Sequence, residues 1–279
     1  MKKKSVIRRI VVITGVIITV LFFLLIELTV KIVNDSSVDM AESDVSIMAQ
    51  SYSNYVSSWL DENLNLLDFY IKSDVVYNFG TADEIGEWLA TTPKRRSPEL
   101  DYVLFIAAEG NSYYDSGKRG NHSDRAYYKA IMNGADYFIT DPTLAKATGK
   151  VSIMLVRPAF DMSGRKVGMF VGVKLIDKIQ QKINSFSLGG HGYAFMLSGT
   201  GMAMCHPNSE IQMQKNFSTD KIDGHDDVAQ IASSMINGSA STGMINSFVI
   251  PGEKDFVFYH PVEKTKWSVA IAVPESQIS

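Results

Sequence analysis

The chain has 279 residues, of which 46% are hydrophobic and 20% charged, a balance that suits a folded protein of one or two domains. The formal net charge is −3, and the first nine residues hold five basic side chains and no acidic one, so the remainder is more acidic still. That balance argues against nucleic acid as a partner. The single cysteine, Cys205, excludes an intrachain disulfide.

Residues 10–26, IVVITGVIITVLFFLLI, carry no charged side chain and follow the basic stretch MKKKSVIRR. Continued to Val33, this run is long enough for a helix that crosses the hydrocarbon core of a bilayer, so we predict a transmembrane helix at 10–33. A cleaved signal peptide is the alternative, but the segment TVKIVNDSSVDM offers no convincing cleavage site. The basic flank predicts a cytoplasmic N-terminus at 1–9, and it places residues 34–279 outside the cell membrane, in the periplasm or extracellular space.

Residues 34–79 are predicted to form one long stalk helix. Apolar residues recur there at alternating steps of four and three, the spacing of a heptad stripe, and no proline precedes Pro93 to force a break. The stripe could pack on the protein's own core or form the seam of a homodimer near the membrane, and the sequence leaves both open. Its members are Ala41, Val45, Met48, Tyr52, Tyr55, Trp59, Leu66 and Phe69.

From Pro98 onward, short strands and turns replace the helical pattern. The predicted elements are two strands around an Ala-Glu-Gly-Asn turn in 102–117, a short helix at 123–133, a hairpin of strands 151–160 and 167–175, and an amphipathic helix at 175–186. The layout then recurs, because 193–208 repeats the first pair of strands and 255–273 repeats the hairpin. Two such copies predict two stacked antiparallel-sheet modules and therefore an α+β fold.

An amino-terminal anchor, a long helix and two modules together resemble the double Cache (dCache) sensor domain of bacterial transmembrane receptors, most of all methyl-accepting chemotaxis proteins. GGHGYAFMLSGTG and HPN resemble the start of its membrane-proximal module, DRAYYKAI the ligand-binding segment of its membrane-distal module, and WSVAIAVPESQI the end of the domain. The resemblance covers roughly residues 34–279. It implies a PAS-like, ligand-binding membrane-distal module at 80–186 and a PAS-like membrane-proximal module at 187–279.

Arg125 stands at the start of the predicted helix in HSDRAYYKAIMNG. Ser123 can cap that helix, but a cation opposes the positive end of the helix dipole. The simplest explanation is an exposed arginine paired with Asp124, and the sequence alone leaves that explanation open. The resemblance implies another, because in amino-acid-sensing members an arginine and the aromatic residue two places later clamp the ligand's carboxylate, and Arg125, Tyr127 and Tyr128 match them. A guanidinium grips a carboxylate through two hydrogen bonds.

The rest of the family's amino-acid pattern is not met. Those receptors hold the ligand's ammonium with two carboxylates, one after an Asp-Pro-aromatic stretch and one on the last strand of the distal module. In DPTLAKATGK, Thr143 stands at the aromatic position and Ala145 at the first acid, and Lys174 stands at the second. Without these acids the electrostatic reason for binding an ammonium is lost.

Alternation along the strand VGMFVGVKL predicts one core face and one open face. Val167, Met169, Val171, Val173 and Leu175 form the apolar face, while Gly168, Phe170, Gly172 and Lys174 form a face with room for a ligand. Lys174 could instead extend to solvent. Otherwise Arg125 and Lys174 face one cavity, and we expect an anionic ligand, a carboxylate or dicarboxylate, rather than a zwitterionic amino acid. The predicted ligand-binding residues are Arg125, Tyr127, Tyr128, Thr143, Phe170 and Lys174.

No pattern predicts catalysis, a metal site or a cofactor, because the histidines and Cys205 lack zinc spacing and neither a GxSxG elbow nor a phosphate loop is present. We therefore expect no enzyme, but the ligand-sensing region of a membrane-embedded, homodimeric bacterial chemoreceptor. Its output to cytoplasmic signalling partners would lie beyond Ser279, in a longer protein. The sensor region of a histidine kinase, diguanylate cyclase or phosphodiesterase is the alternative, followed by a membrane-anchored extracytoplasmic enzyme and a protein-interaction module.

Overall fold

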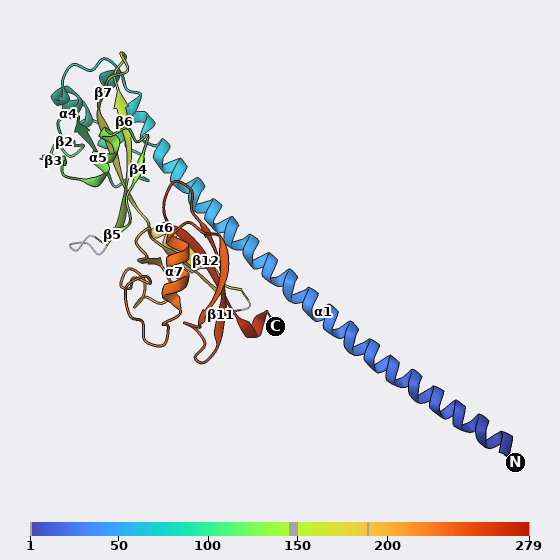
Figure 1. The fold of residues 1–279 in the computed structure, drawn as a ribbon. Coiled ribbons are helices and arrows are strands. Elements are labelled where there is room, and N and C mark those ends of the chain that lie inside the picture. The colour runs from blue at the N-terminus through green and yellow to red at the C-terminus, as the bar shows by residue number, and fades with distance from the viewer. Residues whose placement is uncertain (1, 145–149, 189, 279) are drawn as a thin grey trace.

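The computed structural model describes residues 2–144, 150–188 and 190–278; within its first helix the side chains of residues 2–14, 16–17 and 33–38 are not described. That helix, α1 (Lys2–Asn65), is continuous over 64 residues. Figure 1 shows its amino-terminal half extending away from two sheet modules, while its carboxyl-terminal half lies along both. The architecture is α+β with antiparallel sheets, as the sequence predicted.

Among the residues described, none of the helices is both long enough and apolar enough to cross a membrane. Part of the predicted span at 10–33 lies outside the described side chains, namely residues 10–14, 16–17 and 33.

The predicted single stalk helix at 34–79 is interrupted after Asn65, and two short helices follow, α2 (Asp68–Ile71) and α3 (Asp74–Tyr77). Leu66 N and Leu67 N bond to carbonyls three residues back, which tightens and closes the last turn of α1. The bend buries Leu67 and Tyr70 completely against the sheet of the membrane-distal module. The helix can end here without a proline, because the burial of these side chains offsets the helical hydrogen bonds that are lost.

The module at 80–186, named membrane-distal after the position that the resemblance predicts for it, is a seven-stranded antiparallel sheet in the order β3-β2-β1-β7-β6-β4, with β5 also paired to β6. Alternating apolar residues and glycine turns give the predicted strand pair and hairpin. The strands are β1 (Tyr102–Ala107), β2 (Asn111–Tyr114), β3 (Arg119–Asn121), β4 (Phe138–Ile139), β5 (Thr143–Leu144), β6 (Val151–Phe160) and β7 (Lys166–Leu175). The helices are α4 (Ala82–Leu89), α5 (Ala126–Met132) and a 3₁₀ turn (Pro93–Arg95).

The membrane-proximal module follows α6 (Asp177–Asn184) and repeats the plan with five antiparallel strands in the order β10-β11-β12-β8-β9. One face packs on α7 (Val228–Ile236), and the other, through Met196 and Ile271, joins the core beneath α1. The strands are β8 (Tyr193–Leu197), β9 (Ala203–Cys205), β10 (Ser241–Asn246), β11 (Lys254–Pro261) and β12 (Ser268–Pro274), and a 3₁₀ turn (Glu275–Gln277) follows.

Candidate ligand-binding site

Arg125 lies immediately before α5 as its N-cap residue, and its side chain is 58% exposed. The guanidinium Nε stands 3.5 Å from Asp124 Oδ1, and the Asp124 side chain is 75% exposed. An ion pair this open contributes little to stability. The pairing with Asp124 that the sequence left open is therefore present, and it leaves the guanidinium accessible from solvent.

The two tyrosines that follow Arg125 are held in different ways. Tyr127 is buried on the sheet in an apolar cluster that includes Ile131, Met169 and Val171. This burial raises the pKa of Tyr127 to about 12, so its hydroxyl is neutral at physiological pH. The Tyr128 hydroxyl donates a hydrogen bond to the carbonyl of Ala108 (2.6 Å), which ties α5 to the turn after β1.

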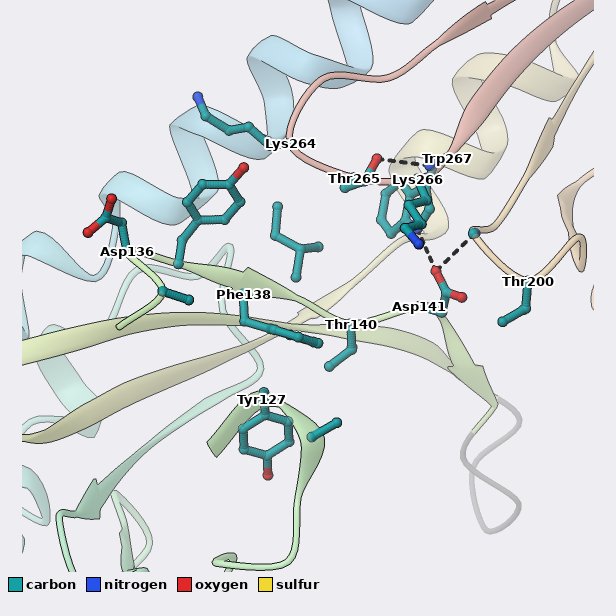
Figure 2. Close-up of a pocket in the computed structure, with 15 residues that line it drawn as sticks. Tyr127, Asp136, Phe138, Thr140, Asp141, Thr200, Lys264, Thr265, Lys266 and Trp267 are labelled. Atoms are coloured by element: carbon teal, nitrogen blue, oxygen red, sulfur yellow. Dashed lines mark hydrogen bonds between the residues drawn. The ribbon is translucent and has the colours of Figure 1, made fainter. Parts of the chain in front are cut away.

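A cavity of about 960 Å³ opens between the two modules, beside the start of α5. Figure 2 shows Tyr127 on one side of the segment that carries Phe138 and Thr140, Lys264 and Thr265 on its other side, and Asp141 and Trp267 at one end. Its walls are contributed by Ala126 and Tyr127, residues 135–141, Gly199 and Thr200, and residues 264–267. Mainly apolar walls with a few polar groups are typical of small-molecule sites.

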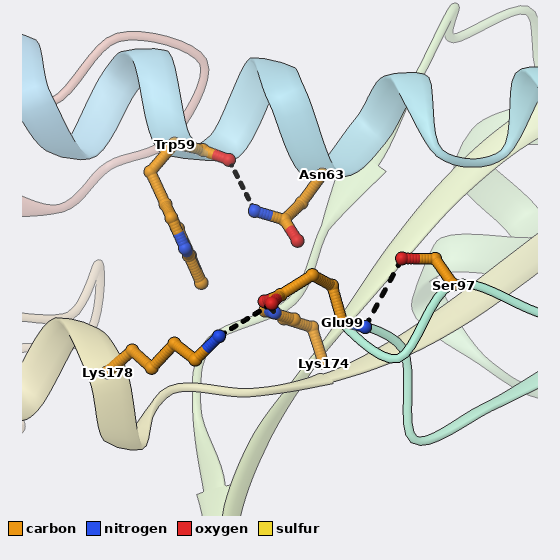
Figure 3. A network of polar contacts seen from close by, with 6 residues as sticks. All are labelled: Trp59, Asn63, Ser97, Glu99, Lys174 and Lys178. Carbon is orange, nitrogen blue, oxygen red and sulfur yellow. Dashed lines mark hydrogen bonds and ion pairs between the residues drawn. The ribbon is translucent and has the colours of Figure 1, made fainter.

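Lys174 does not face this cavity. Its side chain is only 4% exposed and forms an ion pair with Glu99, which also binds Lys178 (2.6 Å). The Lys174 ammonium lies 5.7 Å from the ring centre of Trp59 on α1, as Figure 3 illustrates. The hydrogen bonds from Lys174 and then Lys178 lower the pKa of Glu99 from its usual 4.5 to about 2.

Phe170 lies on the same face of β7 as Lys174. Its ring packs between those of Tyr70 and Phe105, at centroid distances of 5.6 and 5.1 Å. The space beside Gly172 is filled by Leu67 and Leu100 rather than by a ligand, since a Cβ there would stand 3.1 Å from side-chain atoms of both. This packing leaves no space for a ligand beside Phe170.

The prediction that Arg125 and Lys174 converge on one cavity is therefore wrong, and so is the choice of the open face of β7. The strand is central in its sheet and covered on both sides: α5 and Tyr127 pack over Met169 and Val171, while α1 and α2 pack over the opposite face. Alternation separates the two faces correctly, but both are buried.

The residue predicted in the segment after Asp141 does not line the cavity either. Thr143 is exposed on β5, where it pairs with Ser152 and stands outside the cavity lining. Ala145 lies outside the described residues. Sequence reasoning did not single out Asp141 or Trp267 as site residues. Asp141 does belong to the Asp-Pro pair at 141–142, a local signal that could have drawn attention to it.

Within the described ranges, no group of three or more His, Cys, Asp or Glu side chains is arranged to hold a metal ion. The described residues thus form two stacked antiparallel modules, with a helix that runs along both and a solvent-accessible cavity at their junction.

The family model of the Cache domain, in its double form, matches residues 30–279, and the chain belongs to the double Cache family. The methyl-accepting chemotaxis protein PscA of Pseudomonas syringae pv. tomato is 22% identical over 220 residues, which cover 77% of this chain and 34% of PscA. The chain thus spans about a third of the length of that relative.

Two solved structures share the fold. The ligand-binding domain of the Pseudomonas aeruginosa chemoreceptor PctC in complex with GABA has a TM-score of 0.65 and 18% identity, covering 84% of this chain and 99% of that one. An extracellular domain assigned to a histidine kinase has a TM-score of 0.65 and 18% identity, covering 85% of this chain and 98% of that one. At 18% identity, both likenesses establish the shared fold.

Proposed function

We propose that this chain is the extracytoplasmic sensing region of a bacterial transmembrane chemoreceptor that binds a small carboxylate-bearing molecule in its membrane-distal module. The observation that carries the proposal is the solvent-accessible guanidinium of Arg125, which is outside the cavity lining but immediately precedes Ala126 and Tyr127 on the wall of the inter-module cavity. Membership of the double Cache family and the likeness to a chemotaxis protein support the receptor role.

The proposed ligand class is wider than the sequence predicted. Amino acids were set aside because the two acids that would hold an ammonium are replaced by Ala145 and Lys174. The structure removes one part of that objection, since Lys174 is bound to Glu99 on the opposite face of the sheet and its charge does not oppose an ammonium in the cavity. We therefore include amino acids beside carboxylates and dicarboxylates among the compounds to be tested. The PctC domain binds GABA, a compound with one carboxylate and one ammonium, which supports including them.

Isothermal titration of the full 279-residue chain in detergent with L-glutamine, L-serine, GABA and succinate tests the proposal. Arg125→Ala should weaken binding of any bound compound by about tenfold or more, because a charge-assisted hydrogen bond is lost. Arg119→Ala is the matched control, since Arg119 is also exposed (62%) and pairs with an acid, Asp83, away from the cavity. Equal effects of the two variants, or no binding of any compound to the wild type, would refute this site.

The membrane anchor at 10–33 is part of the same proposal. Residues 20–25 are all large apolar residues with exposed side chains, on a stretch of α1 that extends away from both modules (Figure 1). Such a surface is costly in water and stable in a lipid bilayer. Alkaline extraction of cell membranes should leave the full chain in the membrane pellet and release the 34–279 segment, and release of both would contradict an anchor.

A histidine-kinase sensor remains the second candidate, because the extracellular domain assigned to a kinase superposes as well as the chemoreceptor domain does. The sensor region of a diguanylate cyclase or phosphodiesterase would likewise bind its ligand outside the cytoplasm. The output domain of the same polypeptide would distinguish them. A long methylatable coiled coil would support the chemoreceptor proposal, and a kinase or cyclase domain would contradict it.

We also propose that the receptor is a homodimer.

A further inference from the structure

Asp141 joins the two modules through a single carboxylate oxygen. Its Oδ1 accepts a hydrogen bond from the indole Nε1 of Trp267 (2.8 Å), seen in Figure 2, and a second from the backbone N of Gly199 (3.1 Å). Trp267 is buried and stands just before β12, and Gly199 lies in the turn between β8 and β9. One oxygen from the membrane-distal module thus satisfies donors from two turns of the membrane-proximal module.

The position of Asp141 is set by the membrane-distal sheet. β4 pairs with β6, and just after β4 Thr140 N donates to Met154 O (3.1 Å), while the Thr140 hydroxyl accepts from Met154 N (2.9 Å). Asp141 is the next residue, so it must follow any displacement of this edge of the sheet. The segment 135–141 lines the cavity together with Tyr127. A molecule bound in the cavity therefore contacts the segment that carries Asp141.

On its other side, Asp141 is connected to α1. Trp267 ends the turn that joins β11 to β12. Within that turn, Glu263 N donates to the Ser57 hydroxyl on α1 (3.0 Å), and Lys264 forms an ion pair with Asp61 one turn farther along the helix. The contacts form an uninterrupted path from the cavity wall to the helix.

We propose that Asp141 is a positioning residue that passes the occupancy of the cavity to α1 by way of Trp267 and the β11–β12 turn. This inference rests on the proposed function and assigns the step that follows ligand binding. A ligand that binds one position of segment 135–141 more tightly than another shifts Asp141 towards the favoured position. The two hydrogen bonds to its Oδ1 then move the β8–β9 and β11–β12 turns of the membrane-proximal module with it. Since the donors are buried or close-packed, they have no easy alternative partner.

Hydrogen exchange of the full chain in detergent tests the path without any ligand. Asp141→Ala should raise exchange at Trp267 and Glu263, and in residues 53–61 of α1, by about tenfold, because the shared acceptor is gone. Asp141→Asn keeps an oxygen acceptor and should stay within about twofold of the wild type. Asp136→Ala removes another acid from the lining of the same cavity, and its exchange should also stay within about twofold of the wild type.

The second arm adds the tightest binder among L-glutamine, L-serine, GABA and succinate. In the wild type and Asp141→Asn, the ligand should change exchange in both 126–141 and 262–267. In Asp141→Ala, at a ligand concentration that saturates the variant, the change should be confined to 126–141. A purely structural Asp141 would alter the ligand-free exchange but leave the ligand-induced change at 262–267 intact.

Two results would overturn the inference: unchanged exchange at Glu263 and in α1 in ligand-free Asp141→Ala, or a ligand-induced change at 262–267 that persists in this variant. If the wild type binds none of the four compounds, the proposed ligand site fails. In that case, hydrogen exchange of ligand-free wild type and Asp141→Ala still shows whether Asp141 stabilises the β11–β12 turn and α1.

Discussion

Replacing Glu99 by glutamine removes the negative charge that faces the buried ammonium of Lys174 while keeping the shape of the side chain. In the native protein the hydrogen bonds from Lys174 and Lys178 lower the pKa of Glu99 from 4.5 to about 2, which corresponds to an upper bound of about 3 kcal/mol. Because the Glu99 side chain is 39% exposed, solvent screening reduces this figure to about 1–2 kcal/mol.

The pH dependence has a definite sign. The folded-state pKa of Glu99 lies below the unfolded-state value, so its contribution to stability is fully present above about pH 4.5 and is lost as the pH falls towards 2. Glu99→Gln should therefore lower the free energy of unfolding at pH 7. It should also remove the share of Glu99 in the stability that the protein loses between pH 5 and pH 2.

Urea unfolding of the full chain in detergent, followed by tryptophan fluorescence, to which Trp59 beside Lys174 contributes, measures both effects. Adding Lys174→Met to Glu99→Gln should recover much of the lost stability, because a buried apolar side chain needs no counter-charge. The reasoning is refuted if Glu99→Gln loses as much stability as the wild type between pH 5 and pH 2, or if the double variant is less stable than Glu99→Gln alone.

Two further variants probe packing and burial. Gly172→Ala should lower the stability measured by thermal unfolding by about 1–2 kcal/mol, because the new Cβ would crowd Leu67 and Leu100 at 3.1 Å. Gly15→Ala, with nothing within 4 Å, should not lower it, and equal stability of the two variants would contradict the close approach of Leu67 and Leu100 to β7. Burial lowers the pKa of His206 to about 4, so its contribution to stability, present above pH 6.5, should fall as the pH drops from 6.5 to 4. His206→Gln should flatten that decline, and an NMR titration that places the His206 pKa near 6.5 would contradict its burial.

The strand pairs were predictable because their signals are local. Glycine turns and short alternating runs place β1 with β2 and β6 with β7, and the recurrence of the same layout predicts β8, β9, β11 and β12. The end of α1 at Asn65 has no comparable local signal. The helix stops because Leu67 and Tyr70 pack on a strand that lies about 100 residues later in the chain.

The candidate site was only partly predictable for the same reason. Local sequence places Arg125 and Tyr127 at the start of α5, and the structure agrees. The partner of Lys174, however, is Glu99, 75 residues earlier, and the glycines that suggested room for a ligand instead admit Leu67 and Leu100. The cavity itself is assembled from segments about 125 residues apart, a proximity that only the stacking of the modules creates.

A ligand-bound structure of the full chain would test the central claim most directly. We expect the carboxylate of the bound compound within hydrogen-bonding distance of the Arg125 guanidinium, with the rest of the molecule beside Tyr127 in the inter-module cavity. A ligand found instead against Lys174 and Glu99, or within the membrane-proximal module, would contradict the site proposed for this sensor.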